Sequence, residues 1–375
     1  MKKENNPFPV NHYVSPDYFC DRDAETKRLL SAVHNKVNTV LIANRRIGKT
    51  GLIQNTFWHL QKKGVMTFYF DIMATQSLSD FVKQFAEAII GKIETKSDRI
   101  WKQTLLTFAS LRPQISYDPL TGAPEVTVTL ANEKETNPTL ESLFNYIQQQ
   151  SKKKKIVIAI DEFQQIAAYP EKNVEALLRT GVQRMNNVVF LFSGSSRHLL
   201  QQLFNQPSQP FYASAQMLPI EKINADVYKK YIRKGFEKGK KKISDSAMDY
   251  ILQWTRGITF YVQYILNMVY ASSHSIVNEE VINETLVKIV RENEMLYFSI
   301  RNLLTDAQWN LLVAIGKENG AKNILSQSFL QKYKLGSTST TKTALTALLD
   351  REMIVKEEEN YFVYDVFFSR WLQRL

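Results

Sequence analysis

One stretch of the sequence has the residue types that bind phosphate. Residues 43–50 read Ala-Asn-Arg-Arg-Ile-Gly-Lys-Thr, and they follow an apolar run and open a segment with helical periodicity. Gly48 lets the backbone curl so that its N–H groups face phosphates, and a helix N-terminus adds positive potential. Lys49 would contact the β- and γ-phosphates, and Thr50 would offer its hydroxyl to Mg²⁺. The pattern predicts a P-loop that binds ATP and Mg²⁺.

The first position of this loop departs from the usual pattern G-x-x-x-x-G-K-[ST], because Ala43 replaces the first glycine. Alanine fits wherever the local φ is negative. We therefore expect nucleotide binding to be kept, with a mild change in the loop, and hydrolysis to be slow.

A second segment supplies two acids. The continuous apolar run 156–160 is typical of a buried parallel strand, and it ends in Asp161 and Glu162. Asp161 would hold Mg²⁺ through water, and Glu162 would act as the base that polarises the attacking water. Acids often end strands, but this pair follows a P-loop by about 110 residues. The two segments together therefore predict an ATPase in which Lys49 and Glu162 are catalytic.

A third group follows the apolar run 188–192, where residues 193–197 read Ser-Gly-Ser-Ser-Arg. Ser193 would lie beside the acidic strand. Arg197 would reach the γ-phosphate and stabilise charge in the transition state, as an arginine supplied in cis does. The alternative is a surface arginine that caps a helix or pairs with an acid.

These residues need a layered scaffold. Strands are expected at 39–42, 66–72, 156–160 and 188–192, alternating with helices at 23–33, 48–60, 78–93, 140–150 and 174–185. Such alternation predicts an α/β domain over residues 1–219, with a parallel sheet and helices on both faces. The alternating stretches 114–117 and 125–130 flank the turn sequence 118–122, which predicts an inserted β-hairpin near 113–131.

The rest of the chain reads as two further domains. Residues 220–302 carry helical periodicity alone, at 226–239, 244–256, 259–272 and 278–301, and predict a helical lid. Residues 303–375 predict a winged helix, with helices at 306–317, 326–333 and 338–350 before a hairpin of 353–356 and 361–365.

Taken together, these residues resemble the archaeal-type ATPase family within the STAND and AAA-like P-loop NTPases, which includes bacterial, Bacteroidetes-like members. The resemblance runs from about residue 19 to residue 375 and rests on the segments 19–25, 44–50, 161–164, 193–198, 255–263, 335–337 and 365–372. Asp21 stands at a glycine of the family's first motif, F-x-G-R-x-x-E. Thr259 stands at the proline of its lid motif, T-x-G-x-P-x-Y-x-Q.

The resemblance implies an ATP-driven molecular switch with a helical lid and a C-terminal winged helix. In relatives the first motif lies near the base, and the lid motif packs on the nucleotide. The residues expected at the nucleotide are Asn44, Arg45, Arg46, Ile47, Gly48, Lys49, Thr50, Gly51, Arg22 and Ser193. Thr50 and Asp161 are those expected at the metal. A family known mostly by its fold implies no single cellular role.

Composition narrows the protein class. The 375-residue chain has one cysteine, Cys20, which excludes an internal disulfide framework. Its start lacks an apolar signal segment, and no stretch approaches the ~20 apolar residues of a membrane helix. We expect a cytoplasmic protein of undetermined oligomeric state that does not cross a membrane.

The net charge of +11 permits a polyanionic partner. Basic residues gather at 152–155 and 229–242, and both runs are expected to be solvated surfaces. The run 229–242 is also the better candidate for non-specific nucleic-acid contact. The expected recognition helix begins with hydroxyl residues at 337–341, and the wing turn carries three glutamates at 357–359, which would repel DNA. Packing or a protein partner is therefore favoured for the winged helix. The alternatives to an ATPase switch are a nucleotide-gated DNA-binding protein and an interaction scaffold with little hydrolysis.

Overall fold

The computed structural model describes residues 6–92, 111–117, 124–130, 132–272 and 275–375. They form two compact units. The sheet unit comprises Asn11–Tyr228, and the helical unit comprises Lys229–Leu375 together with the N-terminal residues up to Val10.

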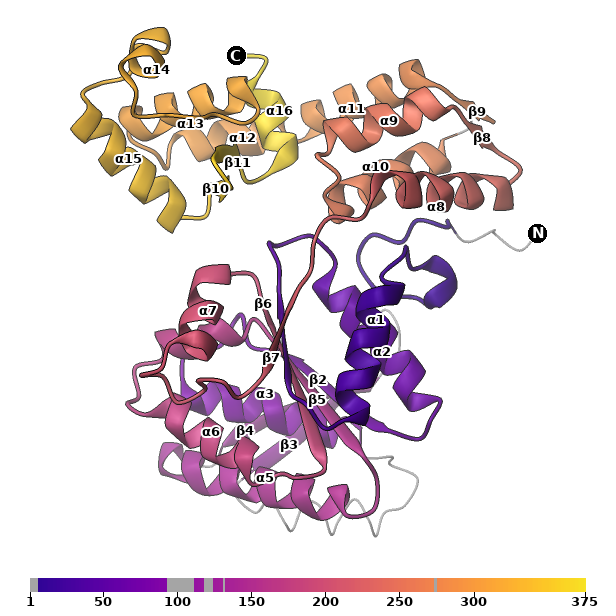
Figure 1. Ribbon diagram of the computed structural model, residues 1–375, viewed down its shortest axis with the longest axis vertical. Helices are drawn as coiled ribbons and strands as arrows, with labels where there is room; N and C mark the ends of the chain where they lie inside the picture. The colour runs from indigo at the N-terminus through magenta and orange to yellow at the C-terminus, as the bar shows by residue number, and fades with distance from the viewer. Residues whose placement is uncertain (1–5, 93–110, 118–123, 131, 273–274) are drawn as a thin grey trace. The chain divides into compact units, whose positions relative to one another are not determined.

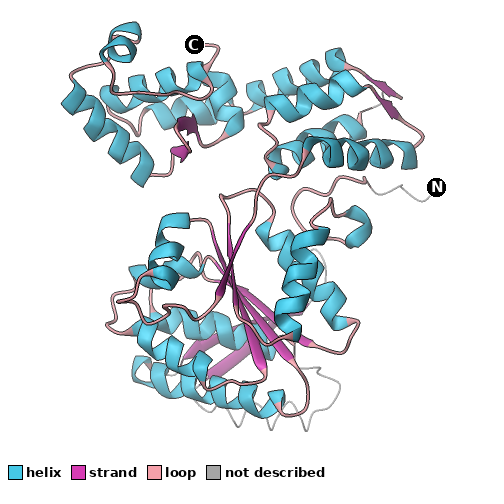
Figure 2. Cartoon of the chain, viewed as in Figure 1, coloured by secondary structure: helices cyan, strands magenta, loops and turns pink. Residues whose placement is uncertain are grey.

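The sheet unit is built on the parallel strands drawn in magenta in Figure 2. The sheet has five strands in the order β2-β5-β6-β1-β7. Their bounds are β1 Thr39–Ile42, β2 Met66–Asp71, β5 Ile156–Asp161, β6 Val188–Gly194 and β7 Gln216–Pro219. Strand β6 lies between β1, which leads into the P-loop, and β5, which ends in the acids. The predicted α/β fold with a parallel sheet is thus confirmed.

Helices cover both faces of this sheet (Figure 1). The α-helices of the unit are α1 Asp23–His34, α2 Lys49–Gln61, α3 Leu78–Ile90, α5 Thr136–Ser151, α6 Val174–Gln183 and α7 Arg197–Asn205. Short 3-10 helices are η1 Pro16–Tyr18, η2 Glu133–Glu135 and η3 Phe163–Ala168. Helices α1 and α2 lie on one face, and α3, α5 and α6 lie on the other.

Strand alternation decides which side chains meet on each face. Ile158 and Ile160 of β5, with Phe190 and Phe192 of β6, belong to the core under α3, α5 and α6. The alternate residues Ala159 and Asp161 of β5 point to the opposite face, where α2 lies. The sheet itself thus directs the acid toward the helix that follows the P-loop.

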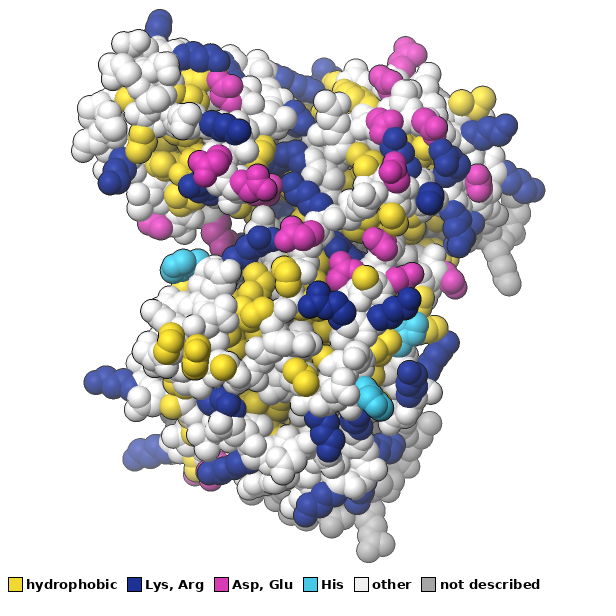
Figure 3. Space-filling model, viewed as in Figure 1, with side chains coloured by type: hydrophobic (Ala, Val, Ile, Leu, Met, Phe, Trp, Pro, Cys, Tyr) yellow, Lys and Arg dark blue, Asp and Glu magenta, His cyan; other side chains and the backbone are white. Residues whose placement is uncertain are grey.

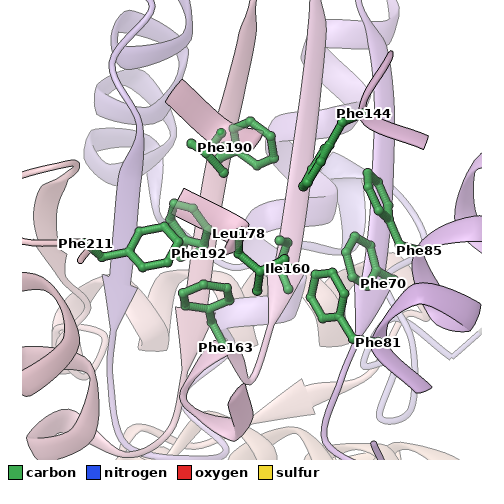
Figure 4. A pocket seen from close by; sticks show the side chains of 11 residues that line it. Phe70, Phe81, Phe85, Phe144, Ile160, Phe163, Leu178, Phe190, Phe192 and Phe211 are labelled. Atoms are coloured by element: carbon green, nitrogen blue, oxygen red, sulfur yellow. The ribbon is translucent and has the colours of Figure 1, made fainter. Parts of the chain in front are cut away.

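The core under α3, α5 and α6 is rich in phenylalanine (Figure 4). Rings from strands and helices surround a void of about 10 Å³, lined by Phe70, Phe81, Phe85, Phe144, Ile160, Phe163, Leu178, Val182, Phe190, Phe192 and Phe211. An apolar void of this size stays dry. The aromatic cluster is therefore packing that fixes the sheet, and not a ligand site.

An antiparallel hairpin lies against α3. Its strands are β3 Leu111–Tyr117 and β4 Pro124–Leu130, paired from Leu111↔Leu130 to Tyr117↔Pro124. The backbone N–H of Val128 donates to Glu87 Oε1 of α3 at 2.9 Å. The expected turn at 118–122 lies outside the described residues.

The lid contains α8 Ala225–Lys238, which belongs to the helical unit from Lys229 onward, and the helices α9 Asp245–Trp254, α10 Thr259–Ala271 and α11 Glu279–Glu292. It also has a short parallel pair, β8 Lys242–Ile243 and β9 Ile276–Val277. The helix expected at 278–301 is interrupted at Asn293, after which α12 Glu294–Arg301 begins. Asn293 donates its side-chain amide to the carbonyl of Ile289 at 2.8 Å and has non-helical φ and ψ, which explains the break.

The winged helix consists of α13 Asp306–Glu318, α14 Gln327–Lys332, α15 Thr338–Asp350, the hairpin β10 Ile354–Glu357 and β11 Asn360–Val363, and α16 Val366–Leu372. Thr305 and Gln308 form a capping box at the start of α13, and Ser337 caps α15. The predicted three helices and wing hairpin are thus present.

A set of contacts, here called the joint, fastens the winged helix to the lid. Arg370 of α16 donates to the carbonyl of Trp254 at 2.8 Å, and Arg256 donates to the carbonyl of Val363 at 3.0 Å. Phe367 packs edge-on against Tyr261, with ring centroids 4.9 Å apart. Burial lowers the pKa of Arg370, and the positive charge of Arg256 acts in the same direction. The two predicted domains therefore belong to one compact unit.

The N-terminal residues also belong to the helical unit, although the sequence assigned them to the first domain. Phe8 is fully buried, and its ring packs on Tyr231, Phe236 and Tyr270. Asn267 donates its side-chain amide to the carbonyl of Phe8 at 2.7 Å. The N-terminal segment packs on the helical unit through the side chain of Phe8. Hydrophobic periodicity could not predict this contact, because it rests on one residue.

No helix among the described residues is long and apolar enough to cross a membrane.

Candidate nucleotide site

The P-loop joins β1 to α2 and depends on its backbone conformation. Gly48, the N-cap of α2, has a φ of 102°, which side-chain-bearing residues rarely adopt. Arg46 is left-handed as well, with a φ of 66°. Ala43 is buried and has no positive φ, so alanine fits at this position. A Cβ on Gly51 would lie 3.1 Å from the ring of Phe19, so the aromatic residue lies against the first turn of α2.

Lys49 folds back over the loop. Its Nζ donates to the carbonyls of Ala43 at 3.2 Å and Asn44 at 3.3 Å, and the residue is 6% exposed. Burial lowers the pKa of Lys49, while the carboxylates of Glu162 and Asp161 oppose this shift. A buried ammonium group that donates to loop carbonyls is suited to accept an anion.

Arg22, in the segment 19–25 that precedes α1, contacts the backbone of the P-loop. The residue is 3% exposed, and its guanidinium donates to the carbonyl of Ile47 at 3.3 Å and pairs with Glu25 at 2.8 Å. Asp21 adopts a left-handed φ of 55°, a conformation that glycine adopts without strain. In this structure Arg22 therefore acts on the loop backbone.

Asp161 lies at the centre of a buried hydrogen-bond network and is 3% exposed. Its Oδ2 accepts from Thr50 Oγ1 at 2.8 Å and from the hydroxyl of Tyr69 at 3.0 Å. Its Oδ1 accepts from Ser193 Oγ at 2.6 Å and from the backbone N–H of Glu162 at 3.1 Å. Three strands and the first turn of α2 thus converge on one carboxylate.

Glu162 is held through one oxygen. Its Oε2 accepts from Gln164 Nε2 at 2.6 Å, from Ser195 Oγ at 2.7 Å and from the backbone N–H of Ser195 at 3.0 Å. The backbone of Glu162 is left-handed, with a φ of 55°. Strained residues of this kind cluster at functional sites.

Two arginines surround this network. Arg45 donates its Nε to Ser195 Oγ at 3.0 Å, which links the P-loop to the end of β6. Arg197 is the first residue of α7, and it is exposed and lies 3.5 Å from Glu221. Its charge is still among those that lower the pKa of Lys49. The structure therefore brings the predicted residues of three segments together, with Arg197 at their exposed border.

The residues present fit Mg²⁺ and a nucleotide. The hydroxyl of Thr50 and the carboxylate of Asp161 are adjacent oxygen donors, which Mg²⁺ prefers. Among the described residues, no group of three or more His, Cys, Asp or Glu could hold a metal ion. At a Mg²⁺ site of the P-loop kind, phosphates and water would supply most of the ligands.

Sequence reasoning missed Tyr69 and Gln164 as parts of the site. Tyr69 reaches Asp161 because β2 pairs with β5, and strand order is not readable from a single strand. Gln164 follows the acids by two residues, and its position within the family-like segment 161–164 was its only signal.

A family profile described as an ATPase domain predominantly from Archaea matches residues 19–265, which is more than half of the chain. A second profile, described as a probable winged helix domain, matches residues 295–374. A search of curated protein sequences found no match.

Solved structures share the fold at low sequence identity. A Walker-type ATPase of Pyrococcus abyssi superposes with a TM-score of 0.66 at 15% identity, covering 98% of this chain and 99% of that one. The ORC2 protein of Aeropyrum pernix, solved as ADPNP–ADP complexes, gives 0.58 at 15% identity, covering 99% and 96%. The ORC1 protein of the same organism, in complex with DNA, gives 0.52 at 14% identity, covering 96% and 94%.

Proposed function

The chain belongs to the family of ATPase domains found predominantly in Archaea, and from this premise we propose that it is a slow Mg²⁺-dependent ATPase and nucleotide switch. The proposal rests above all on the 2.8 Å contact between Thr50 Oγ1 and Asp161 Oδ2. This contact joins the P-loop to the acidic strand, and both are needed to hold a metal–triphosphate complex.

Each residue has a defined part in this proposal. The N–H groups of the P-loop and the ammonium of Lys49 bind the phosphates. Thr50 and Asp161 would hold Mg²⁺, which when bound neutralises charge on the phosphate oxygens. Glu162 orients the attacking water and accepts its proton. Arg197 exchanges Glu221 for the γ-phosphate, because an exposed ion pair at 3.5 Å is weak and easily replaced.

The enzymatic part is tested by Glu162→Gln. We expect kcat to fall at least about 100-fold while ATP still binds, because the variant loses the base and keeps the phosphate site. Steady-state phosphate release and a fluorescent-nucleotide titration measure the two quantities. Glu141→Gln, an exposed change on α5, serves as the matched control. Equal and negligible rates in wild type and variant, with binding kept, would leave a nucleotide-binding scaffold in place of an enzyme.

The switch part concerns the helical unit. The joint fixes the winged helix to the lid through Arg370, Arg256 and Phe367. We propose that the nucleotide state moves both together relative to the sheet unit. Small-angle X-ray scattering of Glu162→Gln with and without Mg²⁺–ATP tests this, and identical profiles at saturating nucleotide would rule it out.

Non-specific DNA contact is a second candidate, favoured by one observation. Lys230 and Lys234 are exposed one helical turn apart on α8. The neighbouring Lys229 and Arg233 instead pair with Asp249 and Asp245. On the face of the lid shown in Figure 3, acidic side chains lie among the basic ones. Lys240 and Lys242, after the end of α8, are exposed as well, so part of the predicted basic segment is open to solvent.

The ORC1 relative was solved with DNA, so a DNA test of this chain is warranted. Gel shifts across a salt series, with and without ATP, would show binding that falls steeply with salt. Replacing Lys230 and Lys234 with Gln should weaken it, whereas replacing Lys152 and Lys153 serves as the control. Absence of binding at low salt would leave a protein partner for the winged helix.

A further inference from the structure

Glu162 differs from the other acids of the site in how its carboxylate is held. All three hydrogen bonds to it converge on Oε2, from Gln164 Nε2, Ser195 Oγ and Ser195 N. No described residue donates to Oε1. A carboxylate fixed through one oxygen presents the other in a single direction, which is the geometry that a general base needs.

The side chain of Gln164 is buried next to the Glu162 carboxylate. The residue is 7% exposed, and its Oε1 is buried without a hydrogen-bond partner. Leaving a buried amide oxygen unpaired is unfavourable, so packing alone does not account for a glutamine here. Its amide nitrogen donates to Glu162 Oε2 at 2.6 Å.

Gly194, at the end of β6, leaves the room that this arrangement requires. A Cβ at this position would lie 1.9 Å from Gln164 Oε1. Any larger residue would therefore displace the glutamine head from Glu162. The next residue, Ser195, supplies the other two donors. The end of β6 therefore contributes both the space for Gln164 and two hydrogen bonds to the carboxylate.

The left-handed backbone of Glu162 makes these restraints necessary. A glutamate with a φ of 55° lies outside its preferred conformations, and such residues persist only where the surroundings hold them. The bonds from Gln164 and Ser195 supply that restraint. Ser195 is also tied to the P-loop through Arg45, at 3.0 Å.

We propose that Gln164 and Ser195 are positioning residues, which fix Oε2 of Glu162 so that Oε1 receives the proton of the attacking water. This inference rests on the proposed ATPase function and deepens it. Both residues act through Glu162, so neither is a catalytic residue itself.

The test uses the full chain and the variant Gln164→Met, which keeps the volume and removes the donor. We expect kcat to fall about 10- to 100-fold, with KM and nucleotide affinity unchanged. Gly194→Ala should give the same pattern by displacing the glutamine. Gln165→Met is the matched control, since the side chain of this neighbour donates to the carbonyl of Thr75 and not to the site.

A double-mutant cycle separates positioning from general stability. In the Glu162→Gln background, Gln164→Met and Ser195→Ala should cause no further loss, because the group they position is gone. Ser196→Ala, which removes the cap of α7, serves as the control for Ser195. A structural role would instead lower both backgrounds by the same factor, and that result would overturn the proposal.

A crystal structure of nucleotide-free Gln164→Met gives a readout independent of turnover. We expect the Glu162 carboxylate to leave its position while Asp161, Thr50 and the P-loop stay in place. An unmoved carboxylate, or an unchanged kcat in an otherwise active enzyme, would overturn this inference and leave the ATPase function intact. No turnover by the wild-type chain would overturn both.

Discussion

The nucleotide site and the joint both enclose cationic side chains, buried at the site and half-buried at the joint, and their hydrogen-bond partners differ. At the site, Lys49 donates to carbonyls of the irregular P-loop, which an incoming phosphate can replace. At the joint, Arg370 donates to Trp254 at the end of α9, and Arg256 donates to Val363 at the end of β11. Carbonyls at the ends of regular elements lack partners within the element. The bonds from Arg370 and Arg256 satisfy them, and no ligand is expected to replace these bonds.

Cationic side chains away from solvent therefore have two different roles in this protein. In the site the buried groups are arranged for exchange with a ligand, and their loss should affect function. In the joint they complete the secondary structure, and their loss should affect stability. Variants in each region can therefore break or sharpen the distinction.

The largest effect is expected from Lys49→Met. Removing the ammonium should lower ATP turnover about 1,000-fold, or about 4 kcal/mol in the barrier, and weaken nucleotide binding. Stability without nucleotide should stay the same or rise, because burial already disfavours the charge of Lys49. Phosphate release and thermal melting measure both, with Lys62→Met at the end of α2 as control. A lower melting temperature of Lys49→Met without nucleotide would show that Lys49 stabilises the fold. The site and the joint would then not differ in the role of their cations.

Phe367→Ala should have the next largest effect, at the joint. Its ring packs on Trp254, Tyr261 and Tyr264, and the residue is 7% exposed. Truncation leaves a cavity and should destabilise the helical unit by about 3 kcal/mol. Urea unfolding followed by tryptophan fluorescence measures this change. Phe298→Ala, at a residue 52% exposed, should change stability much less.

Nucleotide binding by Phe367→Ala sharpens the contrast. Unchanged fluorescent-nucleotide affinity in the folded variant would separate the joint from the site. Loss of affinity equal to that of Lys49→Met would mean that the two regions act as one.

Arg370→Met should have a smaller effect on stability. The carbonyl of Trp254 loses its partner, which costs about 1–3 kcal/mol in the free energy of unfolding. The apolar part of the side chain is kept, so the packing changes little. Arg374→Met, an exposed change four residues later, is the control for the lost charge. Equal stabilities of the two variants would mean that the bond to the end of α9 contributes nothing.

The smallest effect concerns a buried hydrogen bond of the sheet unit. The Tyr169 hydroxyl and Thr75 Oγ1 lie 2.6 Å apart, and burial raises the pKa of Tyr169 to about 12. A raised pKa favours the neutral phenol in the fold. Its stabilising effect is complete below the ordinary value of about 10 and is lost as the pH rises toward 12.

Tyr169→Phe should therefore destabilise the sheet unit by about 1 kcal/mol at neutral pH, through the lost hydrogen bond. The difference from wild type should shrink as the pH rises above about 10. Urea unfolding at neutral and alkaline pH measures it, with the exposed Tyr212→Phe as control. A difference that stays constant with pH would show that the hydroxyl of Tyr169 does not titrate with unfolding.

Much of the fold was predictable because its signals are local. The apolar run 156–160 followed by Asp161 and Glu162 marks a buried strand and its polar end, and both are present. The break at Asn293 was missed, because one side chain competing for a helix carbonyl leaves the apolar period unchanged. The docking of Phe8 was missed for a related reason, since its partners lie more than 200 residues away in the chain.

By itself, the sequence determined the α/β scaffold and the residue types of the site. Gly48, Lys49 and Thr50 follow a strand at fixed spacing, and backbone geometry then dictates their arrangement. Only the tertiary structure decided what surrounds Asp161 and Glu162. The strand order β2-β5-β6-β1 brings Tyr69 and Ser195 to these acids, beside the expected Ser193, because neighbours in a sheet need not be neighbours in sequence.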